Sequence, residues 1–281
     1  MKKLTMILAL ATVTLAAVSC GPKKPQQEEP KAPKMLVVFY SQTSNTKLVA
    51  NEIATRLGAD LAEIVAVDPY DGDFKATIER GKKELDEGIL PEIQPITVNV
   101  ADYDVVFIGY PIWFGTYPPP VATFLSQVDL SGKTIVPFCT FGSGGLESST
   151  KDLYKAEPNA EIREGYGVRA ARLKAMPKEV DQFLKENGFI EGEYTVLDNF
   201  SDYPLTEKEI AIFNAAVGDY PMLHAKPEAV AMRNIPNGME FFFVAVDLPR
   251  EDDPDMPPMG KMEVYVTMED GAEPEFTRVV R

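Results

Sequence analysis

The stretch MLVVFYSQTSNTKLVANEIATRLG, residues 35–58, decides the fold of this chain. It joins an apolar run, 35–40, to a polar run, 41–46, and then to a segment with apolar residues at helical spacing that ends at Gly58. A continuous apolar run is typical of a strand buried on both faces, and the spacing after it is typical of an amphipathic helix. The stretch therefore predicts a strand, a short polar loop and a helix.

The same alternation of strand and helix continues to about residue 190. Strands are expected at 35–40, 60–67, 103–110 and 133–141, with a fifth, weaker strand within 160–169. Helices are expected at 45–58, 74–88, 119–128, 146–158 and 176–189. Five strands with intervening helices predict an α/β fold with a doubly wound parallel sheet and right-handed crossovers.

After residue 190 the pattern changes to one helix followed by strands. A helix is expected at 205–217, where Thr206 and Glu209 form the pattern of a capping box. Strands are expected at 238–248, 260–270 and 274–280, with an acidic, Pro-rich loop at 249–260. The last two strands alternate polar and apolar residues, as antiparallel strands with one covered face do. Residues 196–281 are therefore predicted to form a separate, small α+β domain.

The first 34 residues are expected to lie outside both domains. Residues 1–19 combine a positive start with a short apolar run, which indicates a secretory signal peptide. The ending AAVSC-G resembles the signal of bacterial lipoproteins, in which Cys20 becomes the lipidated first residue; cleavage beside Cys20 without lipid is the alternative. The polar, Pro-rich remainder of 20–34 predicts a linker. We expect an exported protein, in the periplasm or at the bacterial outer membrane, that contacts membrane only through this lipid.

The composition excludes several classes of function. With 28 Lys and Arg against 43 Asp and Glu, the formal net charge is −15, which argues against binding nucleic acid. The single histidine, His224, excludes metal sites built from His clusters and a Ser-His-Asp arrangement in the first domain, so no metal site is predicted. Cys139 lies in an apolar run and is expected to be a buried, unreactive side chain.

Polar and glycine-rich loops follow three of the expected strands, where open α/β sheets bind their ligands. The first loop offers hydroxyls and an amide beside the unpaired N–H groups of a helix start, from Ser41, Thr43, Ser44, Asn45 and Thr46. This set suits a phosphate monoester, although neither a Walker loop nor a dinucleotide fingerprint is present. The alternative is that Ser44 or Asn45 only caps the helix.

The other two loops suit a flat ring. The second carries the only tryptophan, Trp113, which can stack on a heteroaromatic ring or can be a core aromatic near a turn. The third, Gly142 to Gly145, lets backbone approach a planar ligand closely or forms a flexible turn. Together the three loops predict a pocket with a phosphate cradle, an aromatic wall and a glycine-rich edge.

Three stretches carry a family resemblance: VVFYSQTSNTKLVANEIA, DVVFIGYPIWFGTYPPPVATFL and GKTIVPFCTFGSGG. Through them the domain expected over 35–192 resembles the flavodoxin family, and especially its larger flavodoxin-like branch. The resemblance implies a sheet order of 2-1-3-4-5 and FMN as the cofactor. It implies phosphate contacts from the first loop, and ring contacts from Pro111, Ile112, Trp113, Phe114, Gly115, Thr140, Phe141, Gly142, Ser143 and Gly144.

Two parts of the chain depart from known patterns. The family usually has glycine at the position of Ser44, and a backbone with positive φ would be costly for serine there. Residues 205–281 resemble the cystatin-like fold in their order of one helix and successive hairpins. The Q-x-V-x-G signature of the cystatin inhibitors is absent, so this resemblance implies a docking role for a partner rather than protease inhibition.

The sequence thus predicts an FMN-binding redox protein of the bacterial cell envelope. It would transfer electrons with an unknown partner or reduce a small acceptor with NAD(P)H, and no catalytic residue is assigned. The alternative is a flavin-free binding lipoprotein that works through its C-terminal domain, because FMN is made in the cytoplasm and would have to be loaded after export.

Overall fold

The structure, a computed structural model, describes residues 32–194, 199–218, 220, 223–249 and 260–280. The predicted signal peptide, the lipid site at Cys20, most of the linker and most of the acidic loop at 249–260 lie outside these residues. Residues Pro33–Arg281 form one compact unit, which includes both expected domains. Within the described ranges, every helix is too short or too polar to cross a membrane.

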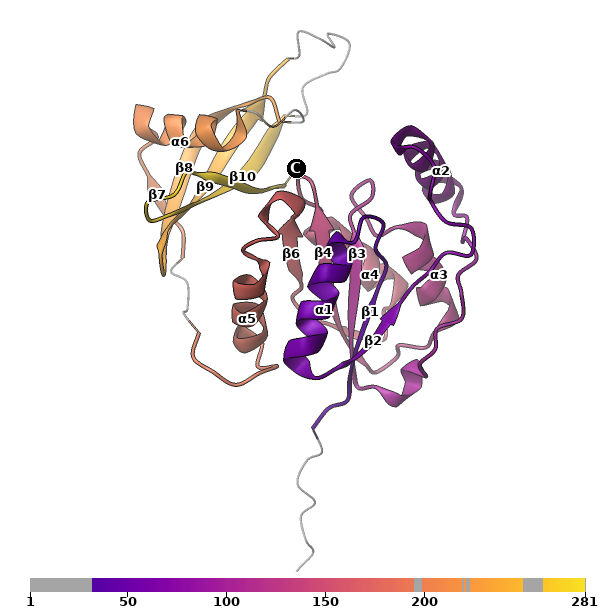
Figure 1. Ribbon diagram of the computed structural model, residues 1–281. Helices are drawn as coiled ribbons and strands as arrows, with labels where there is room; N and C mark the ends of the chain where they lie inside the picture. The colour runs from indigo at the N-terminus through magenta and orange to yellow at the C-terminus, as the bar shows by residue number, and fades with distance from the viewer. Residues whose placement is uncertain (1–31, 195–198, 219, 221–222, 250–259, 281) are drawn as a thin grey trace, which may run out of the picture. The chain divides into compact units, whose positions relative to one another are not determined.

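The first part of this unit is built on a six-stranded parallel sheet (Figure 1). Its strands are β1 (Met35–Phe39), β2 (Asp60–Glu63), β3 (Val105–Pro111), β4 (Thr134–Phe141), β5 (Glu161–Ile162) and β6 (Tyr166–Arg169). The order is β2-β1-β3-β4-β5, and β6 also pairs with β4. The predicted doubly wound sheet and its order 2-1-3-4-5 are confirmed.

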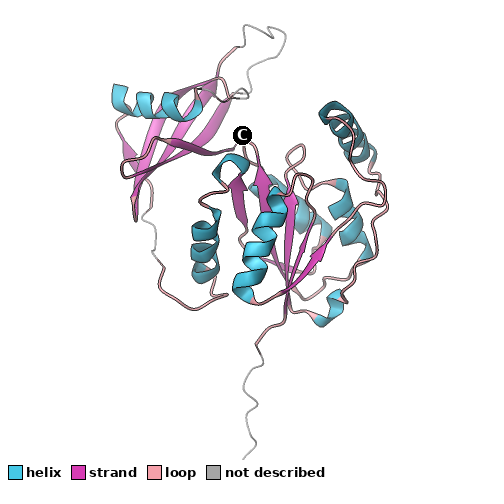
Figure 2. Cartoon of the chain, in the orientation of Figure 1, coloured by secondary structure: helices cyan, strands magenta, loops and turns pink. Residues whose placement is uncertain are grey.

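Helices cover both faces of this sheet (Figure 2). They are α1 (Asn45–Leu57), α2 (Phe74–Glu87), α3 (Pro119–Gln127), α4 (Leu146–Ala156) and α5 (Met176–Glu186), with short 3₁₀ turns at Val100–Asp102 and Ala170–Arg172. Apolar residues of α1 and α5 pack on one face, and those of α3 and α4 pack on the other. Four of the five helices begin and end within two residues of the ranges that the sequence predicts, and α5 ends at Glu186, three residues before the predicted end at 189.

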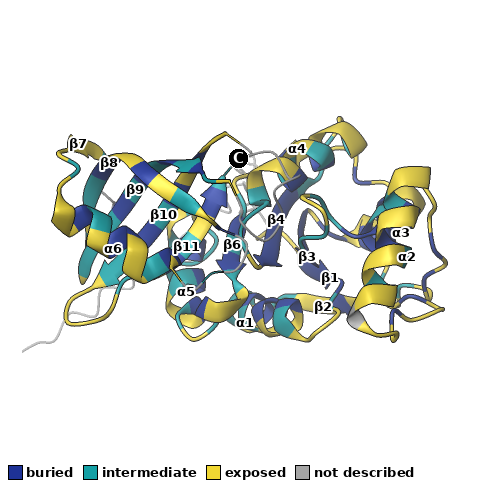
Figure 3. Ribbon diagram, turned by 90° about the horizontal axis from the view of Figure 1, so that it is seen from above, coloured by how far each residue is buried: buried dark blue, intermediate teal, exposed yellow. Residues whose placement is uncertain are grey.

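The central strands have continuous apolar sequences because helices cover both faces of the sheet. Leu36 and Val38 of β1 belong to one buried cluster, while Val37 and Phe39 belong to the other. The first six residues of β3 are buried as well. Figure 3 shows β3 and β4 in the colour of buried residues. Because neither face of these strands meets water, the polar alternation of a surface strand is absent.

Two predicted strands need correction. The second strand was expected at 60–67 but β2 ends at Glu63, because this edge strand pairs only with β1 and has mostly exposed residues. The fifth strand, expected within 160–169, is divided into β5 and β6. β5 pairs with β4 before Pro137 and β6 pairs with it after, and proline has no N–H to donate to a sheet ladder.

The second part is an antiparallel sheet of five strands in the order β11-β10-β9-β8-β7. Its strands are β7 (Ser201–Tyr203), β8 (Ala225–Ile235), β9 (Gly238–Asp247), β10 (Lys261–Glu269) and β11 (Glu275–Val280). Helix α6 (Glu207–Val217) begins with the predicted capping box and packs Ile212 and Phe213 against the inward residues of β9 and β10. The expected antiparallel second domain is confirmed.

The sequence pattern did not predict β7 and β8. β8 contains Pro227 and a register shift between Pro227 and Ala229, so its buried residues do not follow a strict alternation. β7 has three exposed residues and carries no apolar signal at all.

Gly109 of β3 should not tolerate a side chain. A Cβ built there would lie 2.1 Å from the ring of Phe138, which is fully buried on β4. Gly109→Ala is expected to lower the free energy of unfolding by about 1–3 kcal/mol, as overpacking in a well-packed core does. Urea denaturation followed by circular dichroism measures the loss.

A double-mutant cycle provides the control for this prediction. Phe138→Leu removes the ring atoms that cause the clash, so the double variant should lose less stability than the sum of the two single variants. Simple additivity of the two losses would show that the clash is not the cause.

Candidate functional site

Three loops meet at the carboxyl edge of the parallel sheet. They connect β1 to α1, β3 to α3 and β4 to α4, and parallel strands place the ends of all three strands at one edge (Figure 1). This is the edge at which the sequence predicts a pocket.

Ser44 in the first loop has a left-handed backbone. Its φ is 65° and its ψ is −4°, and its side chain makes no capping hydrogen bond to α1. The hydroxyl that caps this turn is that of Ser41, which accepts a hydrogen bond from the backbone N–H of Lys47 at 3.2 Å. A left-handed conformation costs an L-residue about 1–2 kcal/mol. Ser44 therefore stands where the backbone favours glycine, and capping by its side chain does not explain it.

The first turn of α1 carries neutral donors beside this loop. Asn45 and Thr46 are the first two helical residues, so their backbone N–H groups lack partners within the helix. The nearby ammonium of Lys47 is paired with Glu63 at 2.7 Å. An anion here would be held by N–H groups, hydroxyls and the helix dipole rather than by a cationic side chain.

A buried hydrogen bond connects the first loop to β4. The hydroxyls of Thr46 and Thr140 lie 2.8 Å apart, and both residues are buried. Two residues predicted separately for the phosphate and for the ring are thus neighbours. Their hydroxyls hold the start of α1 against the end of β4.

Trp113 packs into an aromatic cluster beneath α2. Its ring lies edge-on to Tyr40 at 5.9 Å and to Tyr70 at 5.1 Å between ring centroids. A Cβ on Gly81 of α2 would lie 3.1 Å from the indole, so α2 covers part of Trp113 closely. Trp113 is half-buried and packs against the edge of the core cluster.

The residue after Trp113 is the exposed aromatic of this loop. Phe114 and Gly115 have φ values of 51° and 82°, and Trp113 and Thr116 exchange two backbone hydrogen bonds of 2.9 and 3.0 Å around them. Two consecutive positive φ values in a hydrogen-bonded turn are the signature of type I′. The turn holds Phe114 outward with 50% of its surface exposed.

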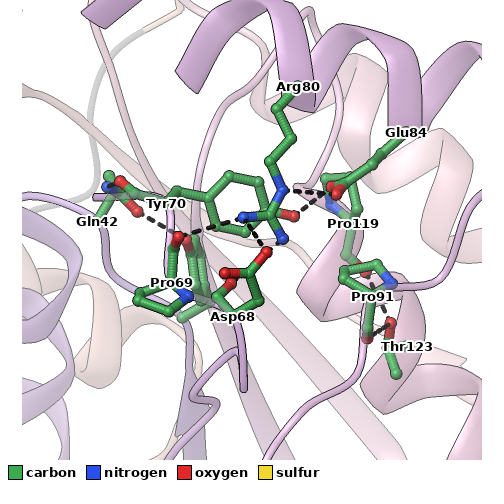
Figure 4. Close-up of polar contacts among 10 residues, drawn as sticks. Gln42, Asp68, Pro69, Tyr70, Arg80, Glu84, Pro91, Pro119 and Thr123 are labelled. Atoms are coloured by element: carbon green, nitrogen blue, oxygen red, sulfur yellow. Dashed lines mark hydrogen bonds and ion pairs between the residues drawn. The ribbon is translucent and has the colours of Figure 1, made fainter. Parts of the chain in front are cut away.

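A polar network braces the first loop against α2 (Figure 4). The side chain of Gln42 accepts a hydrogen bond from the hydroxyl of Tyr40 at 2.7 Å and donates one to the backbone oxygen of Tyr70 at 2.5 Å. The hydroxyl of Tyr70 donates to the buried carboxylate of Glu84. Burial and this hydrogen bond raise the pKa of Tyr70, so the phenol stays protonated and remains a donor.

Arg80 completes the network from α2. Figure 4 shows its side chain across Tyr70, and the guanidinium lies 4.0 Å from the ring centroid. It donates to Glu84 at 2.8 Å and pairs with Asp68 at 3.0 Å. The sequence assigned no role to Gln42, Tyr70, Arg80 or Glu84, because no spacing indicates that α2 packs against this loop.

A cavity of about 580 Å³ opens between the second and third loops. Of the predicted ring contacts, the structure places in its wall Ile112, Phe114, Gly115, Phe141, Gly142, Ser143 and Gly144. Pro111, Trp113, Thr140 and the Ser41–Thr46 loop are not among the residues that line it. The second sheet adds Glu263, Tyr265 and Arg278, which no sequence pattern connected with the site.

The glycines of the third loop are required by close packing. Gly145 has a φ of 119°, and a Cβ there would lie 2.6 Å from Ile112. A Cβ on Gly144 would lie 2.2 Å from the backbone oxygen of Val279. The loop is thus packed on both sides, which does not fit the alternative of a merely flexible turn.

Comparison with known proteins matches the first part of the chain to one family. A family model described as Flavodoxin matches residues 34–182, more than half of the chain. The chain belongs to the flavodoxin family.

Solved structures of flavodoxin-like proteins cover the same part of the chain. A crystal structure of a candidate flavoprotein from Bacteroides eggerthii is 31% identical, covers 53% of this chain and 98% of its own, and has a TM-score of 0.46. A flavoprotein from Lactobacillus acidophilus, crystallised in complex with FMN, is 22% identical, covers 48% and 93%, and has a TM-score of 0.45. The family assignment rests on the match to the family model.

Replacing Ser44 should separate backbone strain from side-chain chemistry. Ser44→Gly removes about 1–2 kcal/mol of left-handed strain and adds roughly 0.5–1 kcal/mol of chain entropy to the unfolded state. The free energy of unfolding should rise by about 0.5–1 kcal/mol, measured by urea denaturation.

Ser44→Ala is the matched control, because it loses the hydroxyl and keeps the strain. It should not become more stable than the wild type. Equal gains from glycine and alanine would show that the hydroxyl, not the backbone, is unfavourable at this position.

Proposed function

We propose that this protein is an FMN-binding redox protein. The observation that carries the proposal is the meeting, at one edge of a flavodoxin sheet, of a neutral anion-binding helix start and a cavity of about 580 Å³ walled by Phe114 and the Gly142–Gly144 loop. A phosphate group and a flat ring are the two ends of FMN, and each end has a matching set of residues here.

The phosphate would be bound at the start of α1. Its ligands would be the backbone N–H groups of Asn45 and Thr46 and the hydroxyls of Thr43 and Ser44. The side chain of Ser44 makes no capping hydrogen bond to α1. Ser41 stabilises the turn through the N–H of Lys47, and Thr46 through Thr140. The positive end of the helix dipole offsets the charge of the phosphate in a chain that is otherwise acidic.

The ring would lie in the cavity. Phe114 offers an aromatic face, held outward by its type I′ turn, and backbone atoms of the Gly142–Gly144 loop line the same cavity. When bound, FMN supplies the electron transfer chemistry, and the surrounding residues orient the ring and limit the access of water.

The described part of the chain offers little competing chemistry. Cys139 is fully buried, and this burial raises the pKa of its thiol well above the ordinary value, so it stays protonated and unreactive. No group of three or more His, Cys, Asp or Glu side chains is placed to bind a metal ion within the described ranges.

The proposal includes a location in the bacterial cell envelope. Its support is the sequence of residues 1–34: a signal peptide, Cys20 at the position of lipidation, and a polar linker. The electron partner would be a protein or a small acceptor of that compartment. FMN would be inserted after export or carried with the folded chain.

Absorption spectroscopy tests the flavin assignment first. The mature chain is purified as a Cys20→Ser variant to keep it soluble, mixed with FMN, and separated from free FMN by gel filtration. Retained absorption bands near roughly 375 and 450 nm are expected of a bound flavin. A protein that retains none would favour the flavin-free alternative, in which the C-terminal sheet binds a partner.

Riboflavin provides a matched control because it lacks only the phosphate. Loss of several charge-assisted hydrogen bonds, each worth about 1.5–3 kcal/mol, should weaken binding by at least roughly 100-fold. Fluorescence titration measures both affinities. Equal affinity for FMN and riboflavin would contradict a phosphate site at the start of α1.

A further inference from the structure

The second sheet pairs its last strand with the third loop of the flavin site. The backbone N–H of Val279 in β11 donates to the backbone oxygen of Ser143 at 2.6 Å. The backbone oxygen of Val279 occupies the place where a side chain on Gly144 would lie. Val279 is buried. The loop therefore contacts this strand in two ways: through the backbone hydrogen bond at Ser143, and through the close approach that Gly144 permits because it has no side chain.

Arg169 links the same loop and strand from the end of β6. Its guanidinium donates to the backbone oxygen of Gly142 at 3.0 Å and to that of Phe276 in β11 at 3.0 Å. The guanidinium also lies 4.5 Å from the ring centroid of Phe276 and 4.7 Å from that of Tyr220. One side chain therefore holds the glycine loop and the second sheet together.

Arg172 adds a second connection. It donates to the hydroxyl of Thr277 at 3.2 Å and to Glu179 of α5 at 2.9 Å, and it lies 3.6 Å from Glu275. Only 8% of its surface is exposed. A buried arginine bonded to both parts of the chain is costly to separate, because its charge would lose these partners.

The second sheet also forms one wall of the cavity. Tyr265 and Arg278 line it together with Phe114, and the guanidinium of Arg278 lies 4.1 Å from the centroid of the Tyr265 ring. Of the other charged groups in the wall, Lys151 is paired with Glu147 at 2.7 Å, and Glu263 accepts a hydrogen bond from the Tyr265 hydroxyl at 3.4 Å. Arg278 is exposed, and its charge contributes, after the hydrogen bond from Lys151, to lowering the pKa of Glu147 in the same wall.

We propose that the second sheet is the outer wall of the flavin pocket. It holds the Gly142–Gly145 loop in its binding conformation, and it restricts access to small, flat electron acceptors whose anionic group meets Arg278. The inference rests on the proposed function. A cavity with one wall from a second sheet suits a small acceptor, whereas an electron-carrier surface for a large protein would need the flavin edge open.

Val279→Pro tests whether the second sheet holds the Gly142–Gly145 loop in place. This N–H points to Ser143 rather than to β10, so proline removes the docking bond and leaves the sheet ladder intact. Loss of one hydrogen bond to the loop should weaken FMN binding by roughly tenfold in fluorescence titration. In the protein without FMN, the amides of residues 143–145 should exchange with deuterium faster than in the wild type.

Arg233→Gln is the matched control within the second sheet. Arg233 pairs with Glu240 inside that sheet at 2.5 Å, so its loss perturbs the sheet but not the docking bond. This variant should keep the wild-type FMN affinity and exchange rates. Unchanged exchange and affinity in Val279→Pro would overturn the inference. Failure of the wild type to bind FMN would instead overturn the proposed function, while the exchange data would still test the docking.

Arg278→Gln tests the recognition of an anion. The reduced holoprotein is mixed with a sulfonated naphthoquinone or with neutral benzoquinone; in each case two electrons and two protons pass to the quinone, and the flavin is reoxidised. The variant should react roughly tenfold more slowly with the sulfonate alone, because it loses one charge-assisted hydrogen bond. Both proteins are saturated with FMN before mixing, so that the comparison of the two quinones does not depend on FMN affinity. Equal slowing with both quinones would contradict the role of Arg278.

Discussion

Burial of β3 and β4 on both faces is the constraint on which the rest of this structure depends. These strands can be fully apolar only because α1 and α5 cover one face of the sheet while α3 and α4 cover the other. Helical crossovers on both faces keep the strands parallel, and parallel strands end at the same edge. All the polar and glycine-rich loops of the site are consequences of that geometry, since they are the connections that leave this edge.

The site stores conformational strain next to a rigid support. Ser44 and Phe114 are the described residues other than glycine with positive φ, and each stands in one of the three loops. Such conformations persist only where the surroundings over-determine them. Here the support is visible: Thr46 bonds to Thr140 beneath the first loop, and Trp113 packs against Tyr40 and Tyr70 beneath the second. The strained conformations of these two loops are thus stabilised by the packed residues beneath them rather than by contacts within the loops.

The two parts of the chain are connected through backbone atoms and arginines rather than through an apolar face. The third loop contributes main-chain contacts from Gly142, Ser143 and Gly144. The side chains of Arg169 and Arg172 donate hydrogen bonds to β11. Contacts of this kind depend on exact loop geometry, so they report on the conformation of the loop. A ligand that orders the loop would therefore favour docking of the second sheet, and the docked sheet would favour the ligand by the same free energy.

The sequence by itself determined the elements whose signal is local. The apolar run of 35–40, the helical spacing of 45–58 and the capping box at Thr206 each reflect burial or hydrogen bonding within a few residues, and each is present in the structure. The order of the sheet and the candidate residues of the first and third loops followed from the family resemblance and the strand ends. The division of the fifth strand was not predicted, because its cause, Pro137, lies on the neighbouring strand.

Only the tertiary structure decided which of these residues share a cavity. Trp113 and Phe114 are adjacent in sequence and equally aromatic, yet a type I′ turn and the packing of α2 place one in a cluster and the other at the cavity. Tyr265 and Arg278 reach the same cavity from more than a hundred residues away. Local sequence carries information about burial and turn formation. It carries none about which distant strand will cover a loop, because that choice is made by long-range packing.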